Sequence, residues 1–428
     1  MSEMSYLEKL LDGVEVEWRN LGDTSLFEIA NNGRKPVKAS LRIAGETPYY
    51  GANNIQDYVD GYTHDGEYVL IAEDGSASLE NYSIQYATGK FWANNHVHVV
   101  RGKERVHTRF LYHYLCIVNF LPFLTGGGRA KLTKGQLIEI PVPIPCPDNP
   151  EKSLAIQSEI VRILDKFTAL TAELTAELSM RKKQYNYYRD QLLSFDEEQE
   201  KPIYLEKLLD GVEVEWKMLG EVIHSLKTGL NPRQNFSLNT LDAQGYYVTV
   251  REIQNGKVVF LDKTDRVNDR ALKIINGRSN LEAGDILFSG TGTVGRIAVI
   301  EENPINWNIK EGVYTIKPIK EKIAPRFLSY LLQSSKIVKD YSKKIVGNPV
   351  ISLPMGDLKK LLIPIPCPGN PEKSLAIQSE IVRILDKFDT LTNSITEGLP
   401  REIELRQKQY EYYRDLLFSF PKPDSVTN

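Results

Sequence analysis

Two long stretches of the chain repeat apolar residues at three- and four-residue spacing. The first stripe consists of Ile156, Ile160, Ile163, Phe167, Leu170, Leu174 and Leu178, and the second of Ile377, Ile381, Ile384, Phe388 and Leu391. Such a stripe is typical of a helix that packs against a partner helix. At 1.5 Å per residue, each region of about 45 residues predicts a helix of roughly 65 Å. We expect the two stripes to bury each other as an antiparallel coiled coil.

Local signals set the ends of these helices. Asn149 and Asn370 can cap the two helices, and each is followed by a proline at the first helical position. The first helix contains the tandem unit TAELTAEL at 171–178, where the second has TNSITEGLP at 392–400. Because Gly398 and Pro400 disfavour a continuous helix, we expect a kink or a break in the second copy.

The helices belong to an internal repeat that covers the chain. YLEKLLDGVEVEW occurs unchanged at 6–18 and 204–216, and PEKSLAIQSEIVRILDKF occurs unchanged at 150–167 and 371–388. KKQYNYYRDQLLSF at 182–195 resembles QKQYEYYRDLLFSF at 407–420. The chain is therefore built twice, with a variable block inside each copy, at 19–140 and 217–360.

The segment LFSGTGTVGRIAVI at 287–300 fits the pattern G-x-G-x-x-G of dinucleotide-binding loops. That pattern requires a strand before it and a helix after it. Here Asp285–Phe288 predicts a strand, but Arg296–Ile300 is β-branched and apolar and predicts a second strand. We therefore interpret the glycines as a hairpin turn rather than a phosphate-binding loop.

Composition excludes several classes of protein. The chain has 428 residues, 41% of them hydrophobic and 25% charged, which is typical of globular proteins. It has no apolar run of about 20 residues that would span a membrane. Three cysteines without metal-ligand spacing fit the reducing cytoplasm, where we expect the protein to act. His96 and His98 are the one close histidine pair. A metal site is one interpretation, but a partly buried strand explains the pair better.

Charge is distributed unevenly between the repeats and the variable blocks. The whole chain has a net charge of −3. Block 19–140 holds 13 Lys and Arg against 12 Asp and Glu, and block 217–360 holds 22 against 14, so their net charges are +1 and +8. The acidity therefore lies in the repeats, and the variable blocks are the parts that can bind phosphate groups.

In this arrangement the chain resembles the specificity (S) subunits, HsdS, of type I restriction–modification systems. PYYGANNIQDYVDGYTHDGEYVLIAEDGS at 48–76, with GKFWANNHVHVV at 89–100, is similar to a recognition-domain signature of that family. GDILFSGTGTVGRIAVI at 284–300 is similar to the alternative form of the same segment. The resemblance covers the whole chain.

The resemblance implies an α+β fold with two globular mixed α/β target-recognition domains, separated by two long antiparallel helices and related by a pseudo-twofold repeat. The predicted segments are a short repeat (1–18), recognition domain 1 (19–148), a central helical region (149–196), a linker with the second short repeat (197–216), recognition domain 2 (217–369), a C-terminal helical region (370–420) and a tail (421–428).

The resemblance also implies a DNA reader without its own chemistry. Each recognition domain would read one half of a bipartite, asymmetric sequence in double-stranded DNA, and the helices would set the spacer and bind two methyltransferase subunits. Restriction subunits would join this core. S-adenosylmethionine, and ATP with Mg²⁺, would bind to the partner subunits and no cofactor to this chain. The sequence contains no methyltransferase N-P-P-[FY] motif and no Walker A motif.

Polar residues in loops beside predicted strands are candidates for contacts with DNA, because amide, hydroxyl and basic side chains read base edges or bind phosphates. The first block offers Tyr49, Tyr50, Asn53, Asn54, Ser76, Lys90, Asn94 and Asn95. The second offers Thr228, Asn231, Arg233, Thr291, Thr293, Arg296, Lys343, Lys344 and Asn348. Two other functions stay open at this point: a coiled-coil scaffold that binds protein or glycan, and a DNA adenine methyltransferase in its own right.

Overall fold

The computed structural model of the protein describes residues 10, 14–126, 130–195, 203–209, 211–232, 235–394 and 396–421. The chain divides into two units. Unit 1 comprises Met1–Glu173 with Glu404–Asn428, and unit 2 comprises Leu174–Ile403. Both ends of the chain thus belong to unit 1, and the central segment forms unit 2.

Unit 1 contains one recognition domain built on two four-stranded sheets. Its strands are β1 (Val16–Asn20), β2 (Phe27–Ile29), β3 (Ala44–Tyr50), β4 (Ile55–Val59), β5 (His64–Asp65), β6 (Tyr68–Ala72), β7 (Ile84–Ala87), β8 (Lys90–Ala93), β9 (Val97–Gly102) and β10 (Pro141–Pro145), and its short helices are α2 (Thr108–Leu115) and α3 (Lys134–Leu137). One sheet has the order β2-β9-β6-β7 and the other β4-β3-β8-β5, and β1 pairs with β10. In the second sheet β3 runs parallel to β8, whereas the first sheet is antiparallel throughout.

Unit 2 contains the other recognition domain, which has the same plan. Its strands are β11 (Val214–Met218), β12 (Ile223–Thr228), β13 (Gly245–Val248), β14 (Ile253–Gln254), β15 (Lys257–Val258), β16 (Arg266–Val267), β17 (Ile286–Ser289), β18 (Ile297–Val299), β19 (Trp307–Ile309), β20 (Val313–Pro318) and β21 (Leu362–Pro366), and its helices are α5 (Ile203–Leu208), α6 (Asp269–Arg278), α7 (Pro325–Gln333), α8 (Ser335–Ser342) and α9 (Met355–Lys359). The sheet β12-β20-β17-β18 corresponds to β2-β9-β6-β7, and β13 runs parallel to β19 as β3 does to β8. The variable blocks therefore share a fold despite their different sequences.

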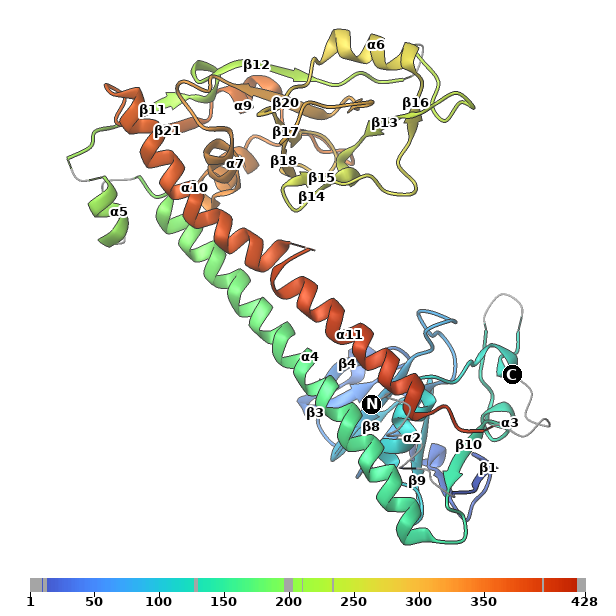
Figure 1. The fold of residues 1–428 in the computed structure, drawn as a ribbon. Helices are drawn as coiled ribbons and strands as arrows, with labels where there is room; N and C mark the ends of the chain where they lie inside the picture. Colours follow the sequence, from blue (N-terminus) through green and yellow to red (C-terminus); the bar gives the residue numbers. More distant parts are fainter. Residues whose placement is uncertain are drawn as a thin grey trace. The chain divides into compact units, whose positions relative to one another are not determined.

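The first long helix, α4 (Pro150–Leu192), is unbroken over 43 residues, whereas its counterpart is divided into α10 (Pro371–Asn393) and α11 (Gly398–Leu417). The predicted break is confirmed, and it falls just before Gly398, whose φ is +75°. The predicted caps are confirmed as well, since the side chains of Asn149 and Asn370 accept hydrogen bonds from the third residue after each. Figure 1 shows α11 alongside the first part of α4 in unit 1 and α10 alongside its second part in unit 2.

Within each unit the helices run antiparallel, and one aromatic stack joins each pair. Phe167 of α4 stacks on Tyr413 of α11 with ring centroids 5.2 Å apart, and Phe388 of α10 stacks on Tyr188 of α4 at 5.5 Å. Phe167 and Phe388 hold the same place in the repeat, as do Tyr413 and Tyr188. The two stacks are therefore copies of one contact.

The predicted helix–helix interface needs a correction at its start. Ile156, Ile160, Ile377 and Ile381 lie in the cores of the recognition domains, and Ile163 and Ile384 pack at the edges of those cores. Leu170 is 37% exposed, and Leu174, Leu178 and Leu391 are half-buried. The stripe thus serves two purposes, because its first turns anchor a recognition domain before the later turns meet a partner helix.

The tail repeats complete these cores. Leu192, Leu193 and Phe195, at the end of α4, are buried in the core of unit 2, while Leu417, Phe418 and Phe420 are buried in the core of unit 1. Each tail therefore packs into the core that contains the recognition domain of the other repeat.

Candidate nucleic-acid interface

The Gly-rich segment of the second domain is a hairpin, as predicted. β17 pairs antiparallel with β18, with Ile286 opposite Val299, so no helix follows the glycines. Gly292 and Gly295 have φ values of +80° and +95°, which favour glycine. Gly290 is required for space, because a Cβ atom there would lie 2.0 Å from the ring of Tyr314. The turn shapes a loop and offers no phosphate-binding helix terminus.

This hairpin loop lies against a second loop in each domain, at matching positions. In unit 2, Thr291 forms a bridge with Ser352, and Leu353 donates its N–H to the carbonyl of Gly290 at 2.8 Å. In unit 1, Asp74 forms the equivalent bridge with Lys131, and Leu132 donates to the carbonyl of Glu73 at 2.8 Å. Both recognition domains therefore present the same pair of loops with different side chains.

In unit 1 the loops after β3, β6 and β8 are tied together by hydrogen bonds. Asn53 donates to the carbonyl of Gly75 and accepts from the N–H of Ala77, both at 2.8 Å. His96 bonds Asp74 at 2.6 Å. These three loops therefore form one polar surface at the end of the sheets.

A charged cluster underlies that surface. The carboxylate of Glu73 lies 2.6 Å from Arg34, 3.0 Å from Lys131 and 3.9 Å from the ring of His98. Burial raises the pKa of Glu73, but the hydrogen bonds from Arg34 and Lys131 outweigh it and leave the pKa below its usual value. Burial lowers the pKa of His98. Glu73 is therefore charged at neutral pH and fixes the hairpin loop.

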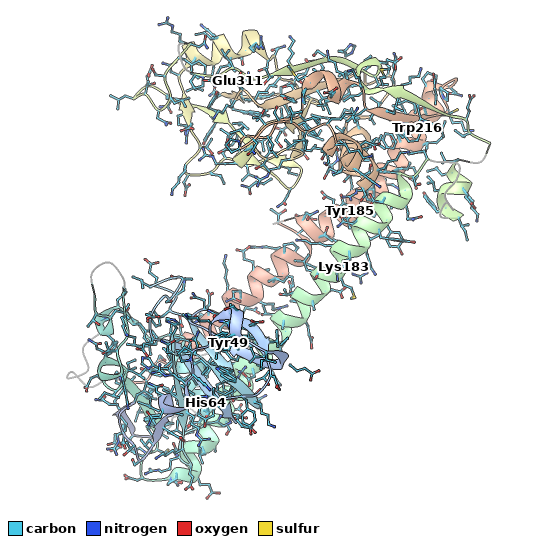
Figure 2. The ribbon with its side chains drawn as sticks, turned by 180° about the vertical axis from the view of Figure 1, so that it is seen from behind. Tyr49, His64, Lys183, Tyr185, Trp216 and Glu311 are labelled. Carbon is cyan, nitrogen blue, oxygen red and sulfur yellow. The ribbon has the colours of Figure 1, made fainter. Side chains whose placement is uncertain are left out.

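Several predicted DNA-contacting residues prove to be structural. Tyr49 is 1% exposed and Asn94 is 4% exposed, so both predictions are corrected: the side chains pack inside domain 1. Figure 2 labels Tyr49 within that domain. The Asn94 side chain accepts a hydrogen bond from the N–H of His96 and shapes the turn.

The other predicted residues fall into two groups. In the first group, Asn53, Ser76, Thr228, Asn231 and Thr291 use their polar atoms within the protein. Tyr50 is half-buried, and burial raises its pKa.

The second group consists of exposed or half-buried residues, of which Lys90 begins β8 and the others lie in loops or at helix ends, namely Asn54, Lys90, Asn95, Thr293, Arg296, Lys343, Lys344 and Asn348. Arg296 lines a polar cavity of about 550 Å³ together with Arg326 and Asp389, and neither Thr291 nor Ser352 lines that cavity. Arg233 lies outside the described residues. The remaining candidates for DNA contact are thus spread over several loops.

Sequence reasoning missed one basic segment of domain 1. Residues 34–43 contain Arg34, Lys35, Lys38 and Arg42 and no acidic residue. Lys35 and Lys38 are exposed, whereas Arg34 and Arg42 pair with carboxylates. Four basic residues within ten positions, without an acidic residue, were the signal that could have identified this segment.

Each recognition domain is attached to the long helices by an equivalent polar joint. In unit 1, Asp165 of α4 lies 2.9 Å from Arg109 and 2.8 Å from His113 of α2, and the other ring nitrogen of His113 lies 3.3 Å from the hydroxyl of Tyr410. Burial lowers the pKa of His113, although Asp165 acts in the opposite direction.

In unit 2, Asp386 of α10 lies 2.6 Å from both Arg326 and Tyr330 of α7. Tyr185 of α4, labelled in Figure 2, is buried in the same core and holds the place that Tyr410 has in unit 1. Gln157 and Gln378 repeat a further contact, since each accepts from a backbone N–H ahead of α2 or α7 at 2.8 Å. The joints are therefore copies that differ by His113 in one and Tyr330 in the other.

The two close histidines do not act together. His96 is exposed and bonds Asp74, whereas His98 is buried and bonds the carbonyl of Leu132. Within the described ranges, no group of three or more His, Cys, Asp and Glu side chains could hold a metal ion. None of the described helices is both long and apolar enough to cross a bilayer.

Known proteins resemble this chain in both sequence and fold. The family described as "Type I restriction modification DNA specificity domain" matches residues 14–180 and 212–405, one segment in each repeat. A Haemophilus influenzae protein assigned to the type I restriction enzyme specificity subunits is 45% identical over 435 residues, which cover 97% of this chain and 98% of the relative. The specificity subunit of the Escherichia coli enzymes EcoR124I and EcoR124II is 38% identical over 448 residues and aligns over 100% of both chains.

A crystal structure of the S subunit of a type I restriction–modification system from M. genitalium covers 96% of this chain and 98% of its own, with a TM-score of 0.56 and 16% identity. That likeness concerns the fold alone. The matches in sequence extend through both recognition domains and the long helices. The chain therefore belongs to the DNA specificity subunits of type I restriction–modification systems.

Proposed function

We propose that each recognition domain of this DNA-recognition subunit reads one half of a bipartite, asymmetric site, and that the long helices set the number of unread base pairs between the halves. The observation that carries the proposal is the pair of equivalent joints. Both involve the unbroken helix α4, at Asp165 and at Tyr185, and the tandem TAELTAEL lies between these residues.

The two domains present different side chains on the same loops, which supports an asymmetric site. Domain 1 carries Asp74 and Lys131 where domain 2 carries Thr291 and Ser352. Charged and hydroxyl side chains prefer different donors and acceptors on base edges. Each domain should therefore select its own half-sequence.

The proposed partners supply the chemistry that this chain lacks. Two methyltransferase subunits would dock on the helical regions and bind S-adenosylmethionine, and restriction subunits would supply ATP- and Mg²⁺-dependent cleavage. This chain would contribute recognition and no catalysis. Incubation with labelled S-adenosylmethionine and duplex DNA should give no methyl transfer by the chain alone and clear transfer by the reconstituted complex. Transfer by the chain alone would contradict a purely recognising role.

Deletion of residues 171–174 tests directly whether the length of α4 sets the number of unread base pairs. Removing four helical residues shortens α4 by about 6 Å and rotates the remainder of the helix by about 40° beyond a full turn. One base pair of B-DNA advances by about 3.4 Å. Methylome sequencing of cells that express the variant complex should show both original half-sites with a shorter unread spacer.

The matched control is Thr171→Ala, which keeps the length of the helix while removing a hydroxyl that bonds the carbonyl of Phe167 at 2.9 Å. The control should leave the spacer unchanged. An active deletion variant that methylates the original spacing would show that α4 does not set the distance.

A further inference from the structure

Each recognition domain has an exposed aliphatic side chain at an equivalent place. It lies just before β3 in domain 1 and just before β13 in domain 2, the first strands of the two parallel pairs. In domain 1, Leu41 and Ile43 are 69% and 71% exposed and precede β3. In domain 2, Leu241 is fully exposed and precedes β13. Single exposed apolar side chains are common on protein surfaces, but these recur at equivalent positions in two diverged blocks.

The backbone around Leu41 is held in place. The hydroxyl of Tyr49 accepts a hydrogen bond from the N–H of Val37 at 3.0 Å, and Arg42 Nε donates to the carbonyl of Val37 at 3.1 Å. The guanidinium of Arg42 lies 4.1 Å from the centre of the Tyr49 ring and 3.3 Å from Asp57. The aliphatic side chains on both sides of Arg42 are therefore presented by a fixed loop.

Leu241 is also presented by an ordered turn. The N–H of Ala243 donates to the carbonyl of Thr240 at 3.0 Å, which places Leu241 at the tip. Asn268 donates to Asp242 at 3.0 Å, and the side chains of Thr240 and Asn268 hold the pKa of Asp242 below its usual value. The turn thus loses little conformational entropy when it meets a ligand.

Cations accompany both aliphatic tips. Lys35, Lys38 and Arg42 line a cavity of about 460 Å³ together with Leu41 and Ile43. In domain 2, Arg266 lies 3.8 Å from the centre of the Tyr246 ring and bonds the carbonyl of Gln244, next to the turn of Leu241. In domain 1 three basic side chains line the cavity with one acidic residue, Asp60, which favours a ligand that offers negative charge beside apolar surface. In domain 2 Leu241 has both Arg266 and the carboxylate of Asp242 as neighbours.

We propose that the loops at 35–43 and 239–244 enter a groove of duplex DNA, one in each half-site. Leu41 and Leu241 contact the apolar surfaces of bases or sugars while the neighbouring cations hold phosphates. Duplex DNA fits because its grooves place phosphates beside thymine methyl groups and base steps that accept aliphatic side chains. The inference rests on the proposed function, which makes the two domains the readers of two half-sites.

The test compares Leu41→Ala and Leu241→Ala in the complex reconstituted with its methyltransferase subunits. The probe is a duplex that carries the site found by methylome sequencing of the wild-type complex. Each variant should bind this duplex about 10-fold more weakly, because it loses a large part of a leucine contact. The slope of log affinity against log salt should not change, since no charge is removed. Lys38→Ala should instead reduce that slope by about 1.

The matched control is Ile203→Ala, at an equally exposed aliphatic residue in α5. It should bind DNA as the wild-type complex does. Size-exclusion chromatography of each variant reports assembly with the methyltransferase subunits. Wild-type affinity in both leucine variants would overturn the inference, as would a loss of affinity that appears only together with a loss of assembly, because the leucines would then contact a partner protein. Absence of a sequence preference in the wild-type complex would instead contradict the proposed function.

Discussion

The two recognition domains keep the same backbone contacts while the residues that make them differ. His98 of domain 1 donates from Nε2 to the carbonyl of Leu132 at 2.7 Å, and Tyr314 of domain 2 donates from its hydroxyl to the carbonyl of Leu353 at 2.8 Å. The larger tyrosine fits because Gly290 stands where domain 1 has Glu73. A change of size in one strand is thus compensated in the neighbouring hairpin.

The joints to the helices repeat this pattern. Asp165 and Asp386 are identical in both copies, but the first holds His113 and the second holds Tyr330. The aspartate from each helix and the arginine from each domain are thus retained, and the domain residue four positions after the arginine varies. This difference explains how one helical frame can carry two unlike recognition domains.

The largest expected effect comes from a core substitution that destabilises one unit and leaves the other unchanged. Phe420→Ala removes a buried ring from the core of unit 1 and Phe195→Ala removes one from unit 2. Each should reduce the free energy of unfolding of its own unit by about 3–5 kcal/mol. Hydrogen exchange read by mass spectrometry should show faster exchange in unit 1 for Phe420→Ala and in unit 2 for Phe195→Ala. Phe420 belongs to the second repeat in sequence but packs in unit 1. Faster hydrogen exchange confined to unit 2 in the Phe420→Ala variant would therefore contradict the packing of each tail with the recognition domain of the other repeat.

A smaller effect tests the compensation between Gly290 and Tyr314. Gly290→Ala places a Cβ atom against the Tyr314 ring and should destabilise unit 2 by about 1–3 kcal/mol. Gly356→Ala is the control, because no atom lies within 4 Å of the added Cβ. Urea denaturation followed by tryptophan fluorescence measures both. Equal urea midpoints for the two variants would show that the Tyr314 ring moves aside without loss of stability.

The smallest effect concerns pH. Burial lowers the pKa of His98 and of His113 in unit 1, where unit 2 has tyrosines. Below about pH 6.5 the unfolded chain binds protons that the folded unit 1 excludes, so the stability of unit 1 is complete above that pH and falls as the pH decreases. Each histidine contributes at most about 1.4 kcal/mol per pH unit.

Tryptophan reporters separate the units in this experiment. Trp18 and Trp92 lie in unit 1, and Trp216 and Trp307 lie in unit 2. A Trp216→Phe, Trp307→Phe variant therefore reports unit 1 alone, and the converse pair reports unit 2. Urea midpoints between pH 7.5 and 5.5 should fall more steeply for unit 1. Adding His113→Gln and His98→Gln should reduce that difference; parallel profiles in the parent variants would contradict the role of the histidines.

The sequence predicted the repeated frame well, because exact repeats and helix caps are local signals. Asn149 and Asn370 cap as expected, the hairpin after Phe288 forms, and the second helix breaks before Gly398. The candidate site was harder to predict. An asparagine such as Asn94 suits a buried turn as well as a DNA contact, and only the packing of the strands shows which it is.

Exchange of block 217–360 for the corresponding block of another family member tests the central claim most directly, with methylome sequencing as the readout. The account predicts that the half-site read by domain 2 changes while the other half-site and the spacer stay the same, because the whole of α4, the unit 1 joint and the helix residue Asp386 of the unit 2 joint are untouched. A change in both half-sites would contradict the separation of reading between the two domains.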